Sequence, residues 1–445
     1  MNQFVFTSRE RMTFFIMMGV GALSLAWAFF VGDDFHARFW SNYLHNAVFF
    51  TGIAAMGLFF IGVTITAWGG WSTLFKRIWE AYSMFLIVGV GLMLVVALGL
   101  WIGYHKLYHW NDAASVADDV ILQGKASFLN KGWYTFGTLG IIAAWYFFAT
   151  KIRSISKAED ANGDRSFSHH HRLRVWAAAT LPLIGFTMVP VVWQWVMSID
   201  AHWYSTMFAW YAGSSWFVSM ICLTILIIIY LKSRGYYSQI NEEHLHDLGK
   251  FLFAFSIFWT YLWFSQYMLI WYANVGEETV YFRHRLDNYK VLFYANLAIN
   301  FVLPFLILMR NDTKRKYGTL VFTSCVVFFG HWLDYFLMIK PGVLHTTHEL
   351  AGHGGHGEAH GAHEAAGHAA GHAAEHGHEA AAHVAEAAHH ASEFVSGYTL
   401  PGFLEIGAMI GFLGLFLYVT FSSLTKASLV PENDPYIAES VHHHA

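Results

Sequence analysis

Several ionisable and amide side chains fall inside long apolar runs of this sequence, where such groups are rare. His331 and Asp334 are three residues apart in one run, so a helix places them on the same face. A histidine beside a carboxylate can exchange a proton near neutral pH, although the same pair could simply join two helices by hydrogen bonds. The other polar residues in or at the ends of the runs include Glu80, Gln194, Asp200, Gln266, Asn296, Asn300 and Glu405. Together they are sufficient for a proton relay.

The stretch WQWVMSIDAHWYSTMFAWY, residues 193–211, places Asp200 and His202 between two apolar runs that are rich in aromatic residues. One interpretation is a helix end whose polar groups reach the water at the membrane surface. The other is a flat aromatic pocket with a few polar groups, as a quinone ring would require. The candidate pocket residues are Trp193, Gln194, Trp203 and Tyr204.

A companion stretch, QYMLIWYANVGEETVYF, covers residues 266–282 and places Glu277 and Glu278 at the end of another apolar run. Mutual repulsion and desolvation favour protonation of one of two adjacent carboxylates. The pair therefore suits a proton entry or exit.

Composition indicates that lipid surrounds most of the chain. Of the 445 residues 56% are hydrophobic and 13% are charged, and the mean hydropathy is positive. Ten apolar runs are long enough to cross about 30 Å of hydrocarbon as helices. They lie near residues 13–31, 44–67, 81–103, 132–150, 174–197, 207–231, 250–273, 291–309, 317–339 and 400–422. We expect an all-α integral membrane protein.

The basic residues predict how the spans are oriented. If both termini are cytoplasmic, 18 of the 26 Lys and Arg residues lie on the cytoplasmic side, where basic residues are retained. This topology places Asp200, His202, Glu277 and Glu278 at the outer face. The net charge is −4 and the basic residues are scattered beside the spans, which disfavours nucleic-acid binding.

The two cysteines, Cys222 and Cys325, form no CxxC or CxxCH motif, so we expect neither an iron–sulfur cluster nor covalently attached haem in this chain. Residues 344–395 form an insertion rich in His, Ala, Gly and Glu, on which a partial helix would align His368, His372 and His376. A soluble spacer, a metal-binding tract and a proton-buffering tether remain open for it. No metal site is predicted elsewhere.

The motifs SIDAHWYSTMFAWY and SQYMLIWYANVGEETVYF, with ten spans, resemble the NrfD/PsrC-like membrane subunits of quinol-oxidising complexes. Within that family they look most like the ActF-type subunits of bacterial alternative complex III. The resemblance covers the ten spans and leaves the His-rich insertion unexplained.

The resemblance implies two four-helix bundles, residues 44–206 and 207–343, flanked by an N-terminal segment with the first helix, residues 1–43, and by the tenth helix with a cytoplasmic tail, residues 396–445. The insertion at 344–395 would be periplasmic. Expected partners in the bacterial inner membrane are an ActC-like second membrane subunit, an iron–sulfur subunit, multihaem cytochrome c subunits, lipid and a terminal oxidase. Haem and iron–sulfur clusters belong to those partners, and the complex uses menaquinone or ubiquinone.

From these observations we expect a subunit of a quinol:cytochrome c oxidoreductase that has no redox centre and no catalytic residue of its own. Its proton pathway would start at Glu80 or Gln266. The further residues of the predicted pathway are His331, Asp334, Asp200, His202, Glu277, Glu278 and Glu405. The alternatives are a chain that itself oxidises quinol, a structural scaffold, and a transporter that works alone.

Overall fold

The computed structural model describes residues 3–31, 34–162, 167–356 and 395–444. Ten helical segments within them are long and apolar enough to span a membrane, which confirms the predicted fold class and number of spans. The spans are α1 (Ser8–Phe30), α2 (Ala37–Thr66), η2–α3–α4 (Gly70–Ile102), α7 (Lys131–Ala161), α8 with η4 (Phe167–Ile199), α9 (Phe208–Ser233), α10 (Glu242–Ala273), α12–η5–α13 (Lys290–Leu308), α15 (Tyr317–His356, apolar to Leu350) and α17 (Phe403–Leu424).

Two helices form the interior of the structure. α2 and α9 bury most of their side chains, and they contact each other as well as α8 and α15. By contrast, α1 exposes most of its apolar side chains, as a helix surrounded by lipid does, and it packs along α17. Gly21 and Gly411 allow this close approach, because a Cβ atom added at Gly21 would lie 2.4 Å from the Gly411 Cα atom.

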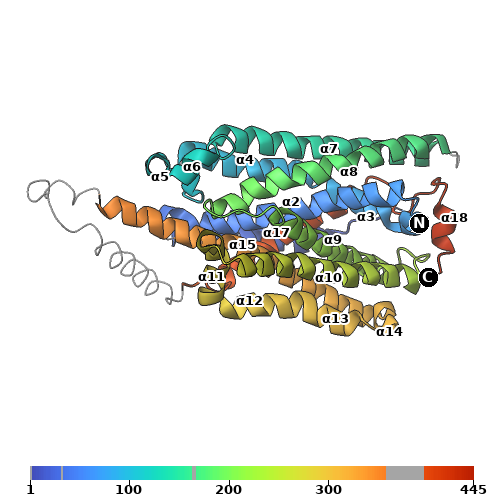
Figure 1. Cartoon of the computed structure of the whole chain (residues 1–445). Helices are drawn as coiled ribbons and strands as arrows, with labels where there is room; N and C mark the ends of the chain where they lie inside the picture. The colour runs from blue at the N-terminus through green and yellow to red at the C-terminus, as the bar shows by residue number, and fades with distance from the viewer. Residues whose placement is uncertain (1–2, 32–33, 163–166, 357–394, 445) are drawn as a thin grey trace, which may run out of the picture.

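Short helices close both ends of the bundle. α5 (Ala113–Asp118), α6 (Val120–Lys125) and α11 (Gly276–Asn288) lie at one end, which we call the loop end. Both chain termini lie at the other, terminal end, together with α14 (Asn311–Arg315) and α18 (Ile437–Val441) (Figure 1). An even number of spans requires this shared end.

Prolines interrupt several spans. Pro304 has no N–H for the carbonyl of Asn300, and the preceding turn, η5 (Ala298–Val302), is a π-helix in which the Leu303 N–H reaches back to the Ala298 carbonyl. Pro341 lies inside α15 and leaves the carbonyl of Leu337 without its helical donor. Both irregular turns adjoin the buried polar groups described below.

α15 is longer than the apolar run 317–339 that predicts it. It continues to His356 and projects from the loop end (Figure 1). The expected partial helix with His368, His372 and His376 lies outside the described residues.

Candidate functional site

A fully buried carboxylate, Asp334 on α15, is the centre of a polar network between the spans. Its Oδ1 atom accepts hydrogen bonds from the Tyr211 hydroxyl and, at 2.8 Å, from Asn296 Nδ2. Its Oδ2 atom accepts one from Trp259 Nε1 at 2.9 Å. These donors come from α9, α12 and α10, so four spans converge on one carboxyl group. All three donors are uncharged.

His331 lies one helical turn from Asp334 and is also fully buried, as the spacing predicted. Its Nδ1 atom is 2.9 Å from Ser215 Oγ, and its Nε2 atom has no hydrogen bond. Ser215 on α9 therefore holds the ring at Nδ1. Asn300 extends the network by donating to Asn296 Oδ1 at 2.6 Å, and its own Oδ1 atom is buried without a hydrogen bond.

A small cavity adjoins this network on the side of the loop end. Tyr211 and Asn296, two of the donors to Asp334, line it together with Gln266 and Arg285. Its remaining walls are Phe208, Trp263, Tyr281, Phe282, Phe293, Leu337 and Met338. The volume of about 20 Å³ holds one water molecule. Gln266, predicted to be functional, also accepts a hydrogen bond from Ser205 Oγ at 3.0 Å.

Arg285 on α11 forms the far wall of the cavity and is almost completely buried. Its guanidinium donates to Asp200 Oδ2 at 3.0 Å and to the Leu337 carbonyl at 3.0 Å, the carbonyl that Pro341 leaves free. It also lies 3.4 Å from the centre of the Tyr281 ring. Burial lowers the pKa of Arg285, but Tyr281 and Asp200 outweigh burial and raise it overall. Asp200 is thus the counter-ion of a buried arginine.

The other residues predicted at the outer mouth lie near the surface. His202 is 44% exposed at its side chain and pairs with Asp119, which precedes α6. Burial raises the pKa of Asp119, yet the hydrogen bond from His202 and two backbone N–H groups lower it overall. Glu277 is exposed and Glu278 is half-buried in the first turn of α11. Among the described residues, no side-chain hydrogen bond joins either glutamate to Asp334.

The four residues predicted to form a quinone pocket have different neighbours, and none of them lines the cavity beside Asp334. Gln194 is buried and donates to the Phe128 carbonyl at 3.4 Å, whereas Tyr204 is 61% exposed. Trp203 stacks on Tyr281 with ring centres 4.0 Å apart, and Trp193 on α8 packs edge-on against Phe128. The chain turns between α8 and α9, at η4 (Met197–Ile199), and this turn sends the two halves of the aromatic stretch to different neighbours.

Glu80 and Glu405, two residues of the predicted proton pathway, are both buried and both are held by arginine. Glu80 on α3 accepts from Arg77 Nη1 at 2.7 Å and from Ser156 Oγ at 2.7 Å. Glu405 on α17 accepts from Arg38 Nε at 2.9 Å and from Asn42 Nδ2 at 2.9 Å. These contacts tie α3 to α7 and α17 to α2.

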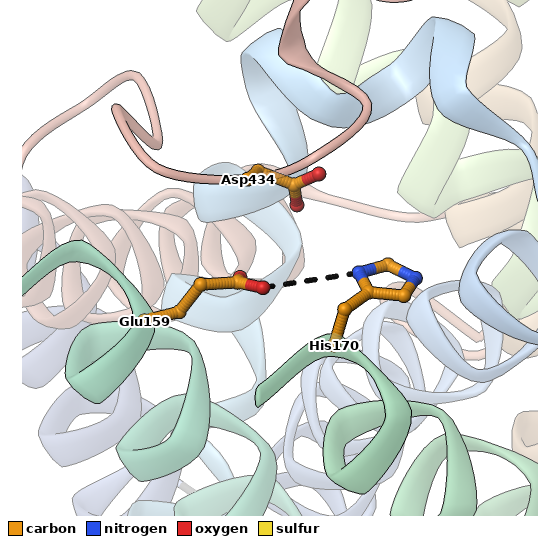
Figure 2. Close-up of side chains that lie close together, drawn as sticks. All are labelled: Glu159, His170 and Asp434. Carbon is orange, nitrogen blue, oxygen red and sulfur yellow. Dashed lines mark ion pairs between the residues drawn. The ribbon is translucent and has the colours of Figure 1, made fainter. Parts of the chain in front are cut away.

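Within the described residues, three side chains could hold a metal ion: Glu159, His170 and Asp434 (Figure 2). Sequence patterns could not group these residues, because they lie in two different spans and in the C-terminal segment. Arg285 was missed for a related reason, since an arginine in an expected outer loop looks like a solvated residue.

Comparison of the sequence with protein-family models and with curated protein sequences returns no match. The function is therefore inferred from the described site and from the motif resemblance.

Proposed function

We propose that this chain is an ActF-type membrane subunit of a bacterial alternative complex III, a respiratory quinol:electron acceptor oxidoreductase that delivers electrons to cytochrome c. The two sequence motifs and the ten spans support this proposal. Both termini are then cytoplasmic, and the loop end faces the periplasm. Spans two to five and six to nine form the two four-helix bundles, with α1 and α17 as a flanking pair. The ActC-like subunit, the iron–sulfur subunit and the multihaem cytochromes supply the quinol site and the redox centres.

In this proposal the chain contributes a proton pathway and helps to hold the complex together. The observation that carries it is Asp334, a fully buried carboxyl group with three neutral donors beside a cavity the size of one water molecule. Such a group can gain or lose a proton without leaving a buried cation uncompensated. Water in the cavity, Gln266 and Tyr211 would link Asp334 to the loop end, where Asp200, His202, Glu277 and Glu278 lie.

The arginine-bound carboxylates have a different part in the proposal. Glu80, Asp200 and Glu405 each pair with a guanidinium, and loss of the Asp200 charge would leave the buried guanidinium of Arg285 without that counter-ion. Glu80 lies toward the terminal end and marks the cytoplasmic entry, and Asp200 with Arg285 closes the periplasmic end. Both pairs position helices and set the local field.

The test is the substitution Asp334→Asn in the intact complex, reconstituted into vesicles. Asparagine preserves size and can still accept from Tyr211 or Trp259, but it carries no exchangeable carboxyl proton. We expect assembly and quinol:cytochrome c electron transfer to be retained while the number of protons moved per electron falls. The matched control is Asp312→Asn on α14, where the aspartate forms an exposed ion pair with Arg310. An unchanged proton-to-electron ratio in the Asp334→Asn complex refutes the proton pathway. The chain would then be a structural scaffold.

The second candidate, oxidation of quinol by this chain itself, has weaker support because the cavity beside Asp334 accommodates water and not a quinone ring. A photoreactive quinone analogue separates the candidates. Labelling of the ActC-like subunit alone agrees with the proposal, and labelling of α9 or α10 in this chain favours the second candidate.

A further inference from the structure

Three potential ligands meet at the terminal end of the molecule, remote in sequence from the Asp334 network. Glu159 lies in the last turn of α7, His170 near the start of α8, and Asp434 in the segment between α17 and α18. One ligand atom from each lies within 4.8 Å of the other two, and His170 Nδ1 is 3.9 Å from Glu159 Oε1. Figure 2 shows the three side chains directed into the same space.

The cluster is buried and its hydrogen bonding is incomplete. Glu159, His170 and Asp434 are 1%, 4% and 1% exposed. Both carboxylate oxygens of Glu159 and both ring nitrogens of His170 lack hydrogen-bond partners. Buried polar atoms in native proteins are almost always satisfied by protein, water or an ion. Glu159 Oε1 and His170 Nδ1 face each other without a hydrogen bond, which indicates a ligand between them.

A cation already approaches these carboxylates. The Lys76 ammonium pairs with Asp434 and lies 3.7 Å from Glu159 Oε2. The neighbouring acids have their own partner, since Arg77 binds both Glu80 and Asp160. His170 and Glu159 Oε1 therefore remain available for a second cation, and Lys76 is the competitor of that cation for both carboxylates.

We propose that Glu159, His170 and Asp434 bind a divalent transition metal, for which Zn²⁺ is the representative ion. Zinc binds imidazole nitrogen and carboxylate oxygen at about 2.0–2.2 Å, and this mixed donor set favours it over Mg²⁺ and Ca²⁺, which prefer oxygen ligands alone. Ligand atoms around such an ion lie roughly 3–3.5 Å apart. Side-chain rotations that move each ligand atom by about 1 Å would therefore bring the three atoms to coordinating distance.

A small cavity beside the cluster leaves room for a further ligand. It is lined by His170, Asp434, Lys76, Tyr436 and half-exposed Trp68, among others, and its volume of about 20 Å³ holds one water molecule. The bound metal would fasten the C-terminal segment to the ends of α7 and α8. This role is independent of quinol chemistry and goes beyond the proposed function.

The test measures hydrogen–deuterium exchange in residues 425–444 of the purified full-length protein, first stripped by a chelator and then supplied with Zn²⁺ or Mg²⁺. Zinc at about ten times its dissociation constant should slow opening of this segment roughly tenfold, and Mg²⁺ should not. His170→Ala should abolish the protection. His171→Ala, at the exposed neighbouring histidine, should retain it.

This pair of variants also controls for zinc bound by other histidines, because both keep the His-rich insertion and His442–His444 unchanged. Equal protection in His170→Ala and His171→Ala would overturn the proposal. Glu159→Gln provides a second, nearly isosteric test and should weaken zinc binding at least tenfold. Lys76→Met removes the competing ammonium and should tighten zinc binding, whereas weaker binding in that variant contradicts the assigned competition.

Discussion

Replacing Arg285 by methionine tests whether this arginine holds the loop end of the structure together. Methionine retains most of the side-chain length but removes the ion pair with Asp200, the hydrogen bond to Leu337 O and the contact with the Tyr281 ring. A lysine would not substitute fully, because it lacks the planar group that serves a carboxylate and a carbonyl together.

The expected loss can be worked out contact by contact. Removing one partner of a buried ion pair costs about 3–5 kcal/mol, and Asp200 is 19% exposed at its side chain, so about 3 kcal/mol is appropriate here. An unsatisfied buried carbonyl at Leu337 adds about 1–3 kcal/mol. Arg285→Met should therefore destabilise the protein by roughly 4–6 kcal/mol, unless the chain relaxes to let water reach both groups.

The assay is thermal unfolding of the purified protein in detergent, followed by tryptophan fluorescence. Two second-site substitutions separate the contributions. Asp200→Asn in the Arg285→Met background should restore part of the loss, since no unpaired carboxylate remains. Pro341→Ala in the same background should restore another part, because alanine returns the N–H that Leu337 O lacks. If Arg285→Met unfolds at the wild-type temperature, or if neither second substitution helps, the assigned role of Arg285 is wrong.

Two further predictions concern helix packing and pH. Gly411→Ile should push α1 away from α17 and lower the free energy of unfolding by about 1–3 kcal/mol, which thermal unfolding would detect. The control is Gly91→Ile, because a Cβ atom added at Gly91 meets no atom within 4 Å. An equal effect from the two substitutions would contradict the assigned contact. Burial and Arg285 lower the pKa of His284 to about 4 from its ordinary value near 6.5. Between these two pH values the unfolded chain binds more protons than the folded chain. Stability should therefore fall as the pH falls from 6.5 to 4. His284→Asn should flatten this part of the stability curve by up to about 3 kcal/mol, and an unchanged slope between pH 6.5 and 4 would show that His284 is not the group responsible.

The positions of the spans could be predicted from the sequence because lipid imposes a simple requirement. A helix needs about 20 apolar residues to cross the hydrocarbon, and ten such runs stand out against the polar loops. The burial of Asp334, His331, Gln266 and Glu405 followed from the same reasoning, since a polar residue within a span normally faces protein.

The partners of those residues could not be predicted in the same way. Arg285 lies 85 residues from Asp200, and Arg38 lies 367 residues from Glu405. Hydropathy does not predict which loops pack against which spans. It also treats an arginine beside a span as a topological marker, so a buried arginine in α11 is indistinguishable from an exposed one. For the same reason, hydropathy could not predict that Asp434 lies close to Glu159 on α7 and His170 on α8.

The buried network and the breaks in the helices have a common physical origin. Backbone without its helical hydrogen bonds is tolerated at membrane depth only where protein or a water-filled cavity satisfies it. Pro304 and the π-turn before it lie next to Asn296 and Asn300, while Pro341 exposes the carbonyl that Arg285 takes. Both breaks lie near Asp334, where neutral donors from three helices meet a carboxyl group. A continuous helix would not offer the Leu337 carbonyl to Arg285, so Pro341 is part of how this sequence places a buried cation near a protonatable group among apolar helices.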